Sequence, residues 1–223
     1  IGRKILLDDI NIKVRDNVIF GLVGCNGAGK TTLLKLILGL YKTNKGNIYI
    51  NGCSINKETL MALKNVGAVM DTPALYKYLS GKRNIDFFNL LGKNVNEKEK
   101  EKIINLLNLG NYVNKPVSTY SLGMKQRLSL AIALVSNPKL LILDEPLNGL
   151  DPNGIRDLRN ILLFLKRKYR MTIVISSHIL AEMENLCDEV AFIKNKKIID
   201  IVNIKTQKES LEKLYFERNK NNV

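Results

Sequence analysis

The sequence predicts an α/β fold in which a sheet-based core carries a helical lobe inserted at residues 72–138. Three observations support this. The apolar run Val18 to Val23 leads through a glycine-rich turn into Lys30 to Leu40, whose leucines and isoleucines fit a buried helix. The wholly apolar run Leu140 to Leu143 is typical of a strand buried on both faces of a parallel sheet. From about Thr72 to Pro138 the pattern of the chain is helical.

The first part of the core is expected to consist mainly of strands. Lys4 to Val14 and Val18 to Val23 look like two strands joined by a polar turn, which predicts an antiparallel β portion near the N-terminus. A short alternating strand is expected between Gly46 and Gly52, where Ile48 and Ile50 alternate with polar residues. Val66 to Met70 is a further apolar strand candidate, and it ends at Asp71-Thr72-Pro73.

The inserted lobe is expected to hold three helices. They are Asn84 to Leu91, Glu97 to Leu109 with Asn96 as its N-cap, and Leu122 to Val135, which Asn137-Pro138 stops. The strand pattern then returns and alternates with helices. We expect a helix at Ile155 to Tyr169, a strand at Thr172 to Ser176, a helix at Ile179 to Leu186, a hairpin of Glu189 to Ile193 with Lys197 to Val202, and a charged helix from Lys205 to Asn222.

Length and composition limit the class of protein. A chain of 223 residues can bury one large core, here with an inserted lobe. It opens on Ile1, so part of the native N-terminus is expected to be missing. Three separated cysteines argue against a disulfide framework or a zinc site. With neither a bilayer-spanning apolar run nor a visible signal peptide, we expect a soluble cytosolic chain.

The net charge of +14 suggests an anionic partner such as a nucleotide, an anionic lipid or a nucleic acid. The lysines are scattered and mixed with glutamates, as in residues 96–102. This pattern favours a solvated basic surface over a specific polyanion site.

The glycine-rich turn carries the strongest chemical signal. It reads Gly24-Cys25-Asn26-Gly27-Ala28-Gly29-Lys30-Thr31-Thr32, and strand, turn and helix follow in the order that a phosphate-binding loop requires. Its glycines let backbone N–H groups point at a phosphate, and the helix N-terminus adds partial positive charge. Lys30 can reach the β- and γ-phosphates, and the Thr31 hydroxyl can ligate Mg²⁺. A plain glycine turn before a helix is the alternative, and it does not explain the lysine and threonine.

A second acidic element is needed to hold the metal. Leu140 to Leu143 leads directly to Asp144 and Glu145, at the carboxyl end of the predicted strand, where ligands gather in parallel α/β sheets. Asp144 is placed to bind the metal or its water, and Glu145 to polarise a water for attack on the γ-phosphate. Two solvated acids at a strand end are the alternative reading.

Tyr120 to Arg127, with the letters YSLGMKQR, opens the third helix of the lobe. Its serine and glycine would again present hydroxyl and N–H groups to an anion, although an N-cap alone would look the same. Taken with the phosphate loop, with Asp144-Glu145, with Asn148-Gly149-Leu150-Asp151 and with Ser176-Ser177-His178, this stretch resembles the ATP-binding cassette (ABC) ATPases. The resemblance covers nearly the whole chain, in order and with similar spacing.

The resemblance implies a P-loop NTPase fold of the ABC type, with one nucleotide-binding domain over residues 1–223. Residues 1–71 and 139–223 would form the α/β core, and residues 72–138 the helical subdomain. Two such domains, expected to be identical, would clasp two ATP molecules head to tail with Mg²⁺. Ser121 and Gly123 would contact the γ-phosphate held by the partner's phosphate loop, Asp151 would link the two sites, and His178 would hold the geometry with Glu145.

Several positions differ from the commonest pattern of the family. Leu122 stands where glycine is usual and Met124 where glutamine is usual. Asp71 stands where most members carry a glutamine that senses the metal and contacts the membrane partner, which implies a metal and coupling role for this carboxylate. Ile1 falls where an aromatic ring normally stacks on adenine.

The YSLGMKQR stretch and residues 71–76 resemble the ATP-binding subunits of bacterial bacitracin-export and lantibiotic-immunity transporters. This implies an ATPase on the cytoplasmic face of the membrane, bound to a separately encoded permease that exports an antimicrobial peptide or another amphiphile. No specific nucleic acid is expected. The alternative from a different class is a non-transport ABC protein that acts on nucleic acid or the ribosome. A regulatory subunit without turnover is disfavoured by Glu145 and His178.

Overall fold

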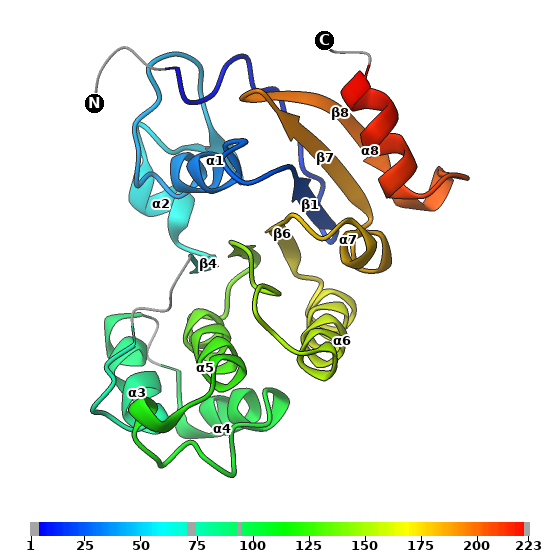
Figure 1. Cartoon of the computed structure of the whole chain (residues 1–223). Coiled ribbons are helices and arrows are strands. Elements are labelled where there is room, and N and C mark those ends of the chain that lie inside the picture. Colours follow the sequence, from blue (N-terminus) through cyan, green and yellow to red (C-terminus); the bar gives the residue numbers. More distant parts are fainter. Residues whose placement is uncertain (1–4, 71–74, 93–94, 221–223) are drawn as a thin grey trace.

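The computed structural model of the chain describes residues 5–70, 75–92 and 95–220. Its centre is a six-stranded sheet with the strand order β4-β5-β6-β1-β7-β8 (Figure 1). The strands are β1 (Ile19–Val23), β4 (Val66–Val69), β5 (Leu140–Leu143), β6 (Thr172–Ser177), β7 (Glu189–Lys194) and β8 (Lys197–Asn203). Five of these strands run parallel, and β8 pairs antiparallel with β7 as the predicted closing hairpin. The predicted α/β fold is confirmed.

The two faces of the sheet are covered by different helices, and β1 shows this alternation. Ile19 and Val23 belong to a core shared with α6 (Pro152–Tyr169), α7 (Leu180–Leu186) and α8 (Leu211–Lys220). Phe20 and Leu22 belong to a second core, shared with α1 (Lys30–Ile37). All four of these side chains are at most 1% exposed. Because period-two alternation sends both sets into a core, the strand reads as continuously apolar.

β4 and β5 are neighbours in the sheet, although about seventy residues separate them in the sequence. In its described part, the chain between these two strands forms three α-helices. These helices are α3 (Gly81–Leu91), α4 (Glu97–Leu106) and α5 (Leu122–Val135), and they lie together at the lower end of Figure 1. Asn96 caps α4 as predicted, since its side chain accepts a hydrogen bond from the Glu99 N–H. Ser121 caps α5 in the same way through the Met124 N–H.

The antiparallel β portion is smaller than the sequence suggests. It consists of β2 (Tyr49–Ile50) and β3 (Cys53–Ser54), which are followed by α2 (Thr59–Leu63). The predicted strand at residues 4–14 is wrong for its described part, because residues 5–14 contain no strand. Its alternating Ile10, Ile12 and Val14 do pack on the α1 core, so the apolar pattern reflects burial of one side rather than pairing with a neighbouring strand.

The C-terminal helix also begins later than predicted. A 3₁₀ turn, η2 (Ile204–Thr206), follows β8, and α8 starts only at Leu211. The Asn203 side chain accepts a hydrogen bond from the Lys205 N–H, which closes this turn locally. A second 3₁₀ turn, η1 (Val117–Thr119), precedes α5. Within the described ranges, no helix is both long and apolar enough to cross a membrane.

Asp188 joins the central strand to α6. Its carboxylate accepts hydrogen bonds from the Ile19 N–H at 2.8 Å and from Lys166 Nζ at 2.6 Å. Burial alone raises the pKa of Asp188, but the bonds from Lys166 and from the Ile19 N–H outweigh it and hold the pKa below the usual value. The ionised carboxylate is therefore stabilised by the fold.

We expect this contribution to stability to be complete above the pKa of an unfolded aspartate, about 3.9, and to be lost as the pH falls through the lower folded pKa. Asp188→Asn removes that titration. The free energy of unfolding of the variant should therefore fall less steeply than the wild type's below about pH 4. Urea unfolding at several pH values measures both slopes, and identical slopes would contradict the assignment.

Candidate functional site

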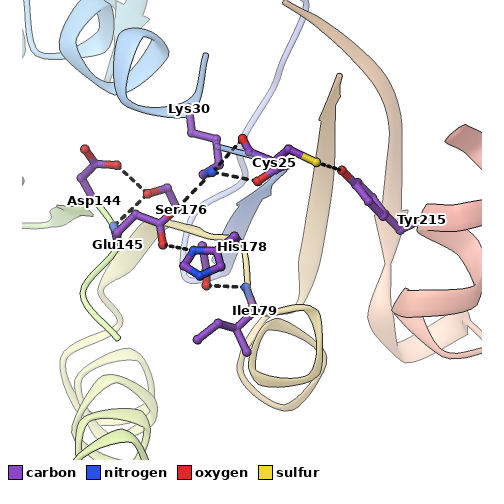
Figure 2. Close-up of polar contacts among 10 residues, drawn as sticks. Cys25, Lys30, Asp144, Glu145, Ser176, His178, Ile179 and Tyr215 are labelled. Atoms are coloured by element: carbon purple, nitrogen blue, oxygen red, sulfur yellow. Dashed lines mark hydrogen bonds and ion pairs between the residues drawn. The ribbon is translucent and has the colours of Figure 1, made fainter. Parts of the chain in front are cut away.

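Three neighbouring strands end at the same edge of the sheet. In the register of the sheet Val23 lies opposite Ser177, and Leu143 lies opposite Ile175. The residues that follow β1, β5 and β6 therefore meet: the phosphate loop, the pair Asp144-Glu145, and His178. Figure 2 shows these side chains turned toward one another. The parallel register thus explains why segments far apart in sequence form one site.

The phosphate loop is shaped by close backbone approach. A Cβ placed on Gly24 would lie 2.4 Å from the Ile193 carbonyl oxygen, so no larger residue fits there. Gly29 precedes α1 with φ at +115°, a conformation that glycine adopts at little cost. The loop therefore turns sharply into the N-terminus of α1, where unpaired N–H groups favour an anion. Thr31 and Thr32 stand in the first turn of α1, both half-buried.

Lys30 is nearly buried, with 5% of its surface exposed. Its Nζ donates hydrogen bonds to the carbonyl oxygens of Gly24 at 2.8 Å and Cys25 at 3.3 Å. It also forms an ion pair with Glu145, with 3.1 Å between Nζ and Oε1 (Figure 2). Without a bound phosphate, the ammonium thus has three oxygen partners, one for each of its N–H donors. An incoming phosphate would replace the carboxylate as the partner of the charge.

Glu145 is held in an uncommon conformation. Its φ is +47°, in the left-handed region that non-glycine residues rarely occupy. Its Oε2 lies 2.9 Å from His178 Nδ1, and 22% of its side chain is exposed. Because an ionised carboxylate only accepts hydrogen bonds, Nδ1 is the protonated ring nitrogen in this pair. The carboxylate is therefore aimed by a histidine and a lysine from two other strand ends. Such strain at a carboxylate is typical of functional sites.

Ser176 links the two acids. Its hydroxyl donates to Asp144 Oδ1 at 2.6 Å and accepts from the Glu145 N–H at 2.9 Å. Ser176 is fully buried and Asp144 is 4% exposed. Ser176 lies in a motif of the sequence, but sequence reasoning alone assigns it no role. A buried hydroxyl at the end of an apolar strand is the signal that could have indicated one, since buried hydroxyls need partners.

Ser176→Ala is expected to lower kcat by roughly 10- to 100-fold, because Asp144 and Glu145 lose the bond that aligns them. It should also cost about 1 to 3 kcal/mol of stability, because a buried N–H is left without its acceptor. Ser177→Ala is the matched control, since the Ser177 hydroxyl accepts the Ile179 N–H of the following turn and forms no other hydrogen bond within the described residues. It should lower the melting temperature and spare kcat. Equal kcat values for the two variants would exclude the positioning role.

The other candidate residues gather elsewhere. Ser121, Gly123 and Asp151 line a pocket of about 300 Å³ between α5 and α6, and no phosphate-loop residue lines it. Asp151 caps α6, since its Oδ1 accepts the Gly154 N–H at 3.0 Å. Within one chain, the structure does not bring this set to the phosphate loop.

Leu122, the first residue of α5, contacts the loop that follows β5. A Cβ placed on Gly149 would lie 2.7 Å from Leu122 Cδ2, so the start of α5 and this loop are in direct contact. Leu122 itself is half exposed. Asp71 and Ile1 lie outside the described residues.

The outer side of the phosphate loop contacts the C-terminal helix. Cys25 Sγ lies 3.2 Å from the Tyr215 hydroxyl, and Figure 2 shows it pointing away from Lys30. The neighbouring Asn26 and Gly27 are exposed, and Ala28 is half-buried. The contact between Tyr215 and Cys25 could not be predicted from the sequence. The two residues are 190 positions apart, and Tyr215 lies in a charged segment with no pattern that indicates a partner.

A family model described as "ABC transporter" matches residues 7–148, which is more than half of the chain. The chain belongs to the ABC transporter family. As an ABC ATP-binding subunit it is an ATPase, and ATP is its nucleotide. The predicted family, fold and activity are thereby confirmed, and Lys30, Asp144 and Glu145 lie within the matched residues.

Relatives with similar sequences are themselves ABC ATP-binding proteins. The chain is 45% identical over 215 residues to the "uncharacterized ABC transporter ATP-binding protein YhcH" of Bacillus subtilis, covering 96% of this chain and 70% of the relative. It is 43% identical to the "lantibiotic transport ATP-binding protein SrtF" of Streptococcus pyogenes, covering 89% and 84%. It is 39% identical to the "bacitracin transport ATP-binding protein BcrA" of Bacillus licheniformis, covering 89% and 65%.

Solved structures share the ABC fold. An "ATP binding subunit of ABC transporter" superposes with a TM-score of 0.84 at 28% identity, covering 96% of this chain and 93% of the other. A dimeric cassette described as a post-hydrolysis state bound to ADP and Pi superposes with a TM-score of 0.81, covering 92% and 94%. At 21% identity the second likeness shows the fold alone.

Proposed function

We propose that the chain powers a bacterial membrane exporter, and that the exported cargo is an antimicrobial peptide or a related amphiphile. The cluster of Lys30, Glu145 and His178 carries the hydrolytic part of the proposal. Likeness to a bacitracin transport protein and to a lantibiotic transport protein supports the cargo class. The cargo itself would be bound by the membrane subunit, so this chain supplies force rather than substrate recognition.

The proposed reaction follows from the contacts of the site. Lys30 would exchange Glu145 for the β- and γ-phosphates of ATP, since its ammonium already lies beside the loop carbonyls. The released carboxylate of Glu145 would accept a proton from the attacking water. His178, hydrogen-bonded to Glu145, would hold that carboxylate in place and contact the γ-phosphate. The remaining loop residues, Gly24 to Gly29 with Thr32, would bind phosphate through the backbone.

Mg²⁺ fits the oxygen donors present. Mg²⁺ prefers one or two carboxylates together with waters and substrate phosphates over a cage made entirely of protein. Asp144 offers a buried carboxylate that Ser176 already orients, and Thr31 offers a hydroxyl at the start of α1. When bound, the ion would neutralise charge on the phosphates. Asp71 is proposed to take part in the same site and in coupling to the membrane subunit.

Two copies of the chain are proposed to share each ATP. Because Ser121 and Gly123 line a pocket apart from the phosphate loop, they are free to meet the γ-phosphate of a second chain. Asp151, in the same lining, would connect the two sites. We propose a homodimer in which residues 1–71 and 139–223 are the core, and residues 72–138 the lobe that transmits motion. The pair would sit on the cytoplasmic face of the membrane, bound to a separately encoded permease.

Purification of the tagged full-length protein from detergent-solubilised native cells tests the partnership. We expect a multi-spanning membrane protein at near-equal stoichiometry, identified by mass spectrometry. Recovery of ribosomal proteins or of nuclease-sensitive material, with no membrane subunit, would instead support an ABC protein that acts on nucleic acid. Either result can be read without knowledge of the cargo.

A further inference from the structure

The segment between α1 and β4 exposes apolar side chains that the ATP site does not use. Leu60 is 90% exposed and Met61 61% exposed, both on α2. Leu40 is 62% exposed and Tyr41 46% exposed, in the loop after α1. We call these four residues the lobe patch; they lie in residues 1–71 and not in the helical lobe of residues 72–138.

The two segments that carry the lobe patch lie side by side. A Cβ placed on Gly39 would lie 3.3 Å from Thr59 Cγ2, so the residues directly before Leu40 and Leu60 touch. The Asn56 side-chain amide donates to the Thr43 hydroxyl at 3.0 Å, which ties the same two segments together a second time. Figure 1 shows α2 beside α1 in the upper left of the picture.

The exposed side chains of the lobe patch are not part of the small apolar cluster beneath α2. The opposite side of α2 packs inward through Ala62, 2% exposed, against Ile50 and Ile55. Leu60 and Met61 are therefore exposed on a helix that is anchored to the protein by its other side. Replacing them should not unfold this part of the core.

The segment that carries the lobe patch is rich in lysine. Residues 35–64 contain five lysines and one acid, Glu58, whose carboxylate accepts a hydrogen bond from the Ser54 N–H. Lys35 Nζ lies 5.6 Å from the centre of the Tyr41 ring. The other four lysines are exposed, and within the described part of the chain none of the five forms an ion pair; they are Lys42, Lys45, Lys57 and Lys64.

We propose that the lobe patch rests on the surface of an anionic lipid bilayer. Apolar side chains would enter the headgroup region while the lysines contact lipid phosphates, and stable surface binding requires such a combination of two weak signals. A nucleic acid would be drawn by the lysines but would gain little from Leu60 and Met61, because strand binding rewards aromatic stacking. This contact is separate from ATP hydrolysis and from any permease, and so goes beyond the proposed function.

Flotation of the purified full chain with lipid vesicles tests the contact. We expect binding to vesicles of phosphatidylcholine mixed with phosphatidylglycerol, and little binding to phosphatidylcholine alone. Binding should weaken as salt is raised from about 0.1 M to about 1 M, because the screening length falls from about 10 Å to about 3 Å. No binding to the anionic vesicles would overturn the proposal.

Three double variants locate the contact. Leu60→Ser with Met61→Ser, and Lys42→Gln with Lys57→Gln, should each lower the vesicle partition coefficient by about tenfold or more. Leu90→Ser with Leu91→Ser is the control, since those leucines are 72% and 71% exposed at the end of α3. It should bind like the wild type.

All three double variants should keep the ATPase rate and melting temperature of the wild type. If the apolar variant is misfolded, the lysine variant still decides the question. Vesicle binding retained by the lysine variant, or lost equally in the Leu90 and Leu91 control, would overturn the assignment. So would loss of permease binding with unchanged vesicle binding, which would make the lobe patch a protein interface.

Discussion

Glu145→Gln is expected to bind ATP normally and to hydrolyse it at least about 100 times more slowly than the wild type. The amide keeps the size of the carboxylate and can still hydrogen-bond His178, but it cannot accept a proton from water. Phosphate release and nucleotide binding, measured on the same preparation, separate the two effects. With hydrolysis blocked, the two chains should stay clasped on ATP and elute as a dimer.

Glu101→Gln is the matched control for that experiment, because Glu101 is exposed on α4, far from the phosphate loop in sequence. It should keep the wild-type rate and, like the wild type, should not be trapped as a long-lived dimer on ATP. Hydrolysis by the Glu145 variant at the wild-type rate would exclude Glu145 as the base.

Lys30→Ala is expected to lower ATP affinity by about 10- to 100-fold, since one charged hydrogen-bond donor to the phosphates is lost. Before nucleotide binds, the same change also leaves Glu145 without its 3.1 Å cation partner. The defect should therefore lie in binding, whereas the defect of the Glu145 variant lies in turnover. Titration with a fluorescent ATP analogue measures the dissociation constant.

Lys139→Ala serves as the control, because Lys139 is exposed just before β5, at the opposite end of that strand from Asp144. Its ATP affinity should match the wild type's. Unchanged affinity in the Lys30 variant would contradict the phosphate-binding role of the loop.

The sequence predicted the bounds of those helices and strands that capping residues and apolar runs delimit. The strand Leu140–Leu143 and the helix Leu122–Val135 have the expected bounds. Both are delimited by neighbours with clear chemistry: Pro138 stops the helix, Ser121 caps it, and two acids end the strand. Where capping and burial agree, sequence alone is sufficient to place an element.

The N-terminal segment shows why other elements could not be placed. Ile10, Ile12 and Val14 have the period of a strand, and they are packed on one side. Strand pairing, however, also needs a neighbouring backbone in register, which a single sequence does not reveal. Periodicity therefore predicted which side of the segment is buried, and not its hydrogen bonding.

For the site, residue types and spacing predicted which strand ends carry the chemistry. The contacts between them are tertiary, and the Lys30–Glu145 ion pair and the Ser176 bridge depend on the parallel register of β1, β5 and β6. Resemblance to the ABC family is the source of the proposal that each ATP site is shared by two chains. The lobe patch could not be anticipated, because its four apolar residues are scattered over two short segments that meet only in the folded chain.

The composite ATP site is tested most directly by the rate of ATP hydrolysis per chain, measured across a wide range of chain concentrations. If each ATP is held by the phosphate loop of one chain and Ser121 of another, the rate per chain rises with concentration. It then levels off once dimers predominate. A rate per chain that is the same at every concentration would mean that one chain hydrolyses ATP alone. Absence of phosphate release at all concentrations would contradict hydrolysis by identical pairs.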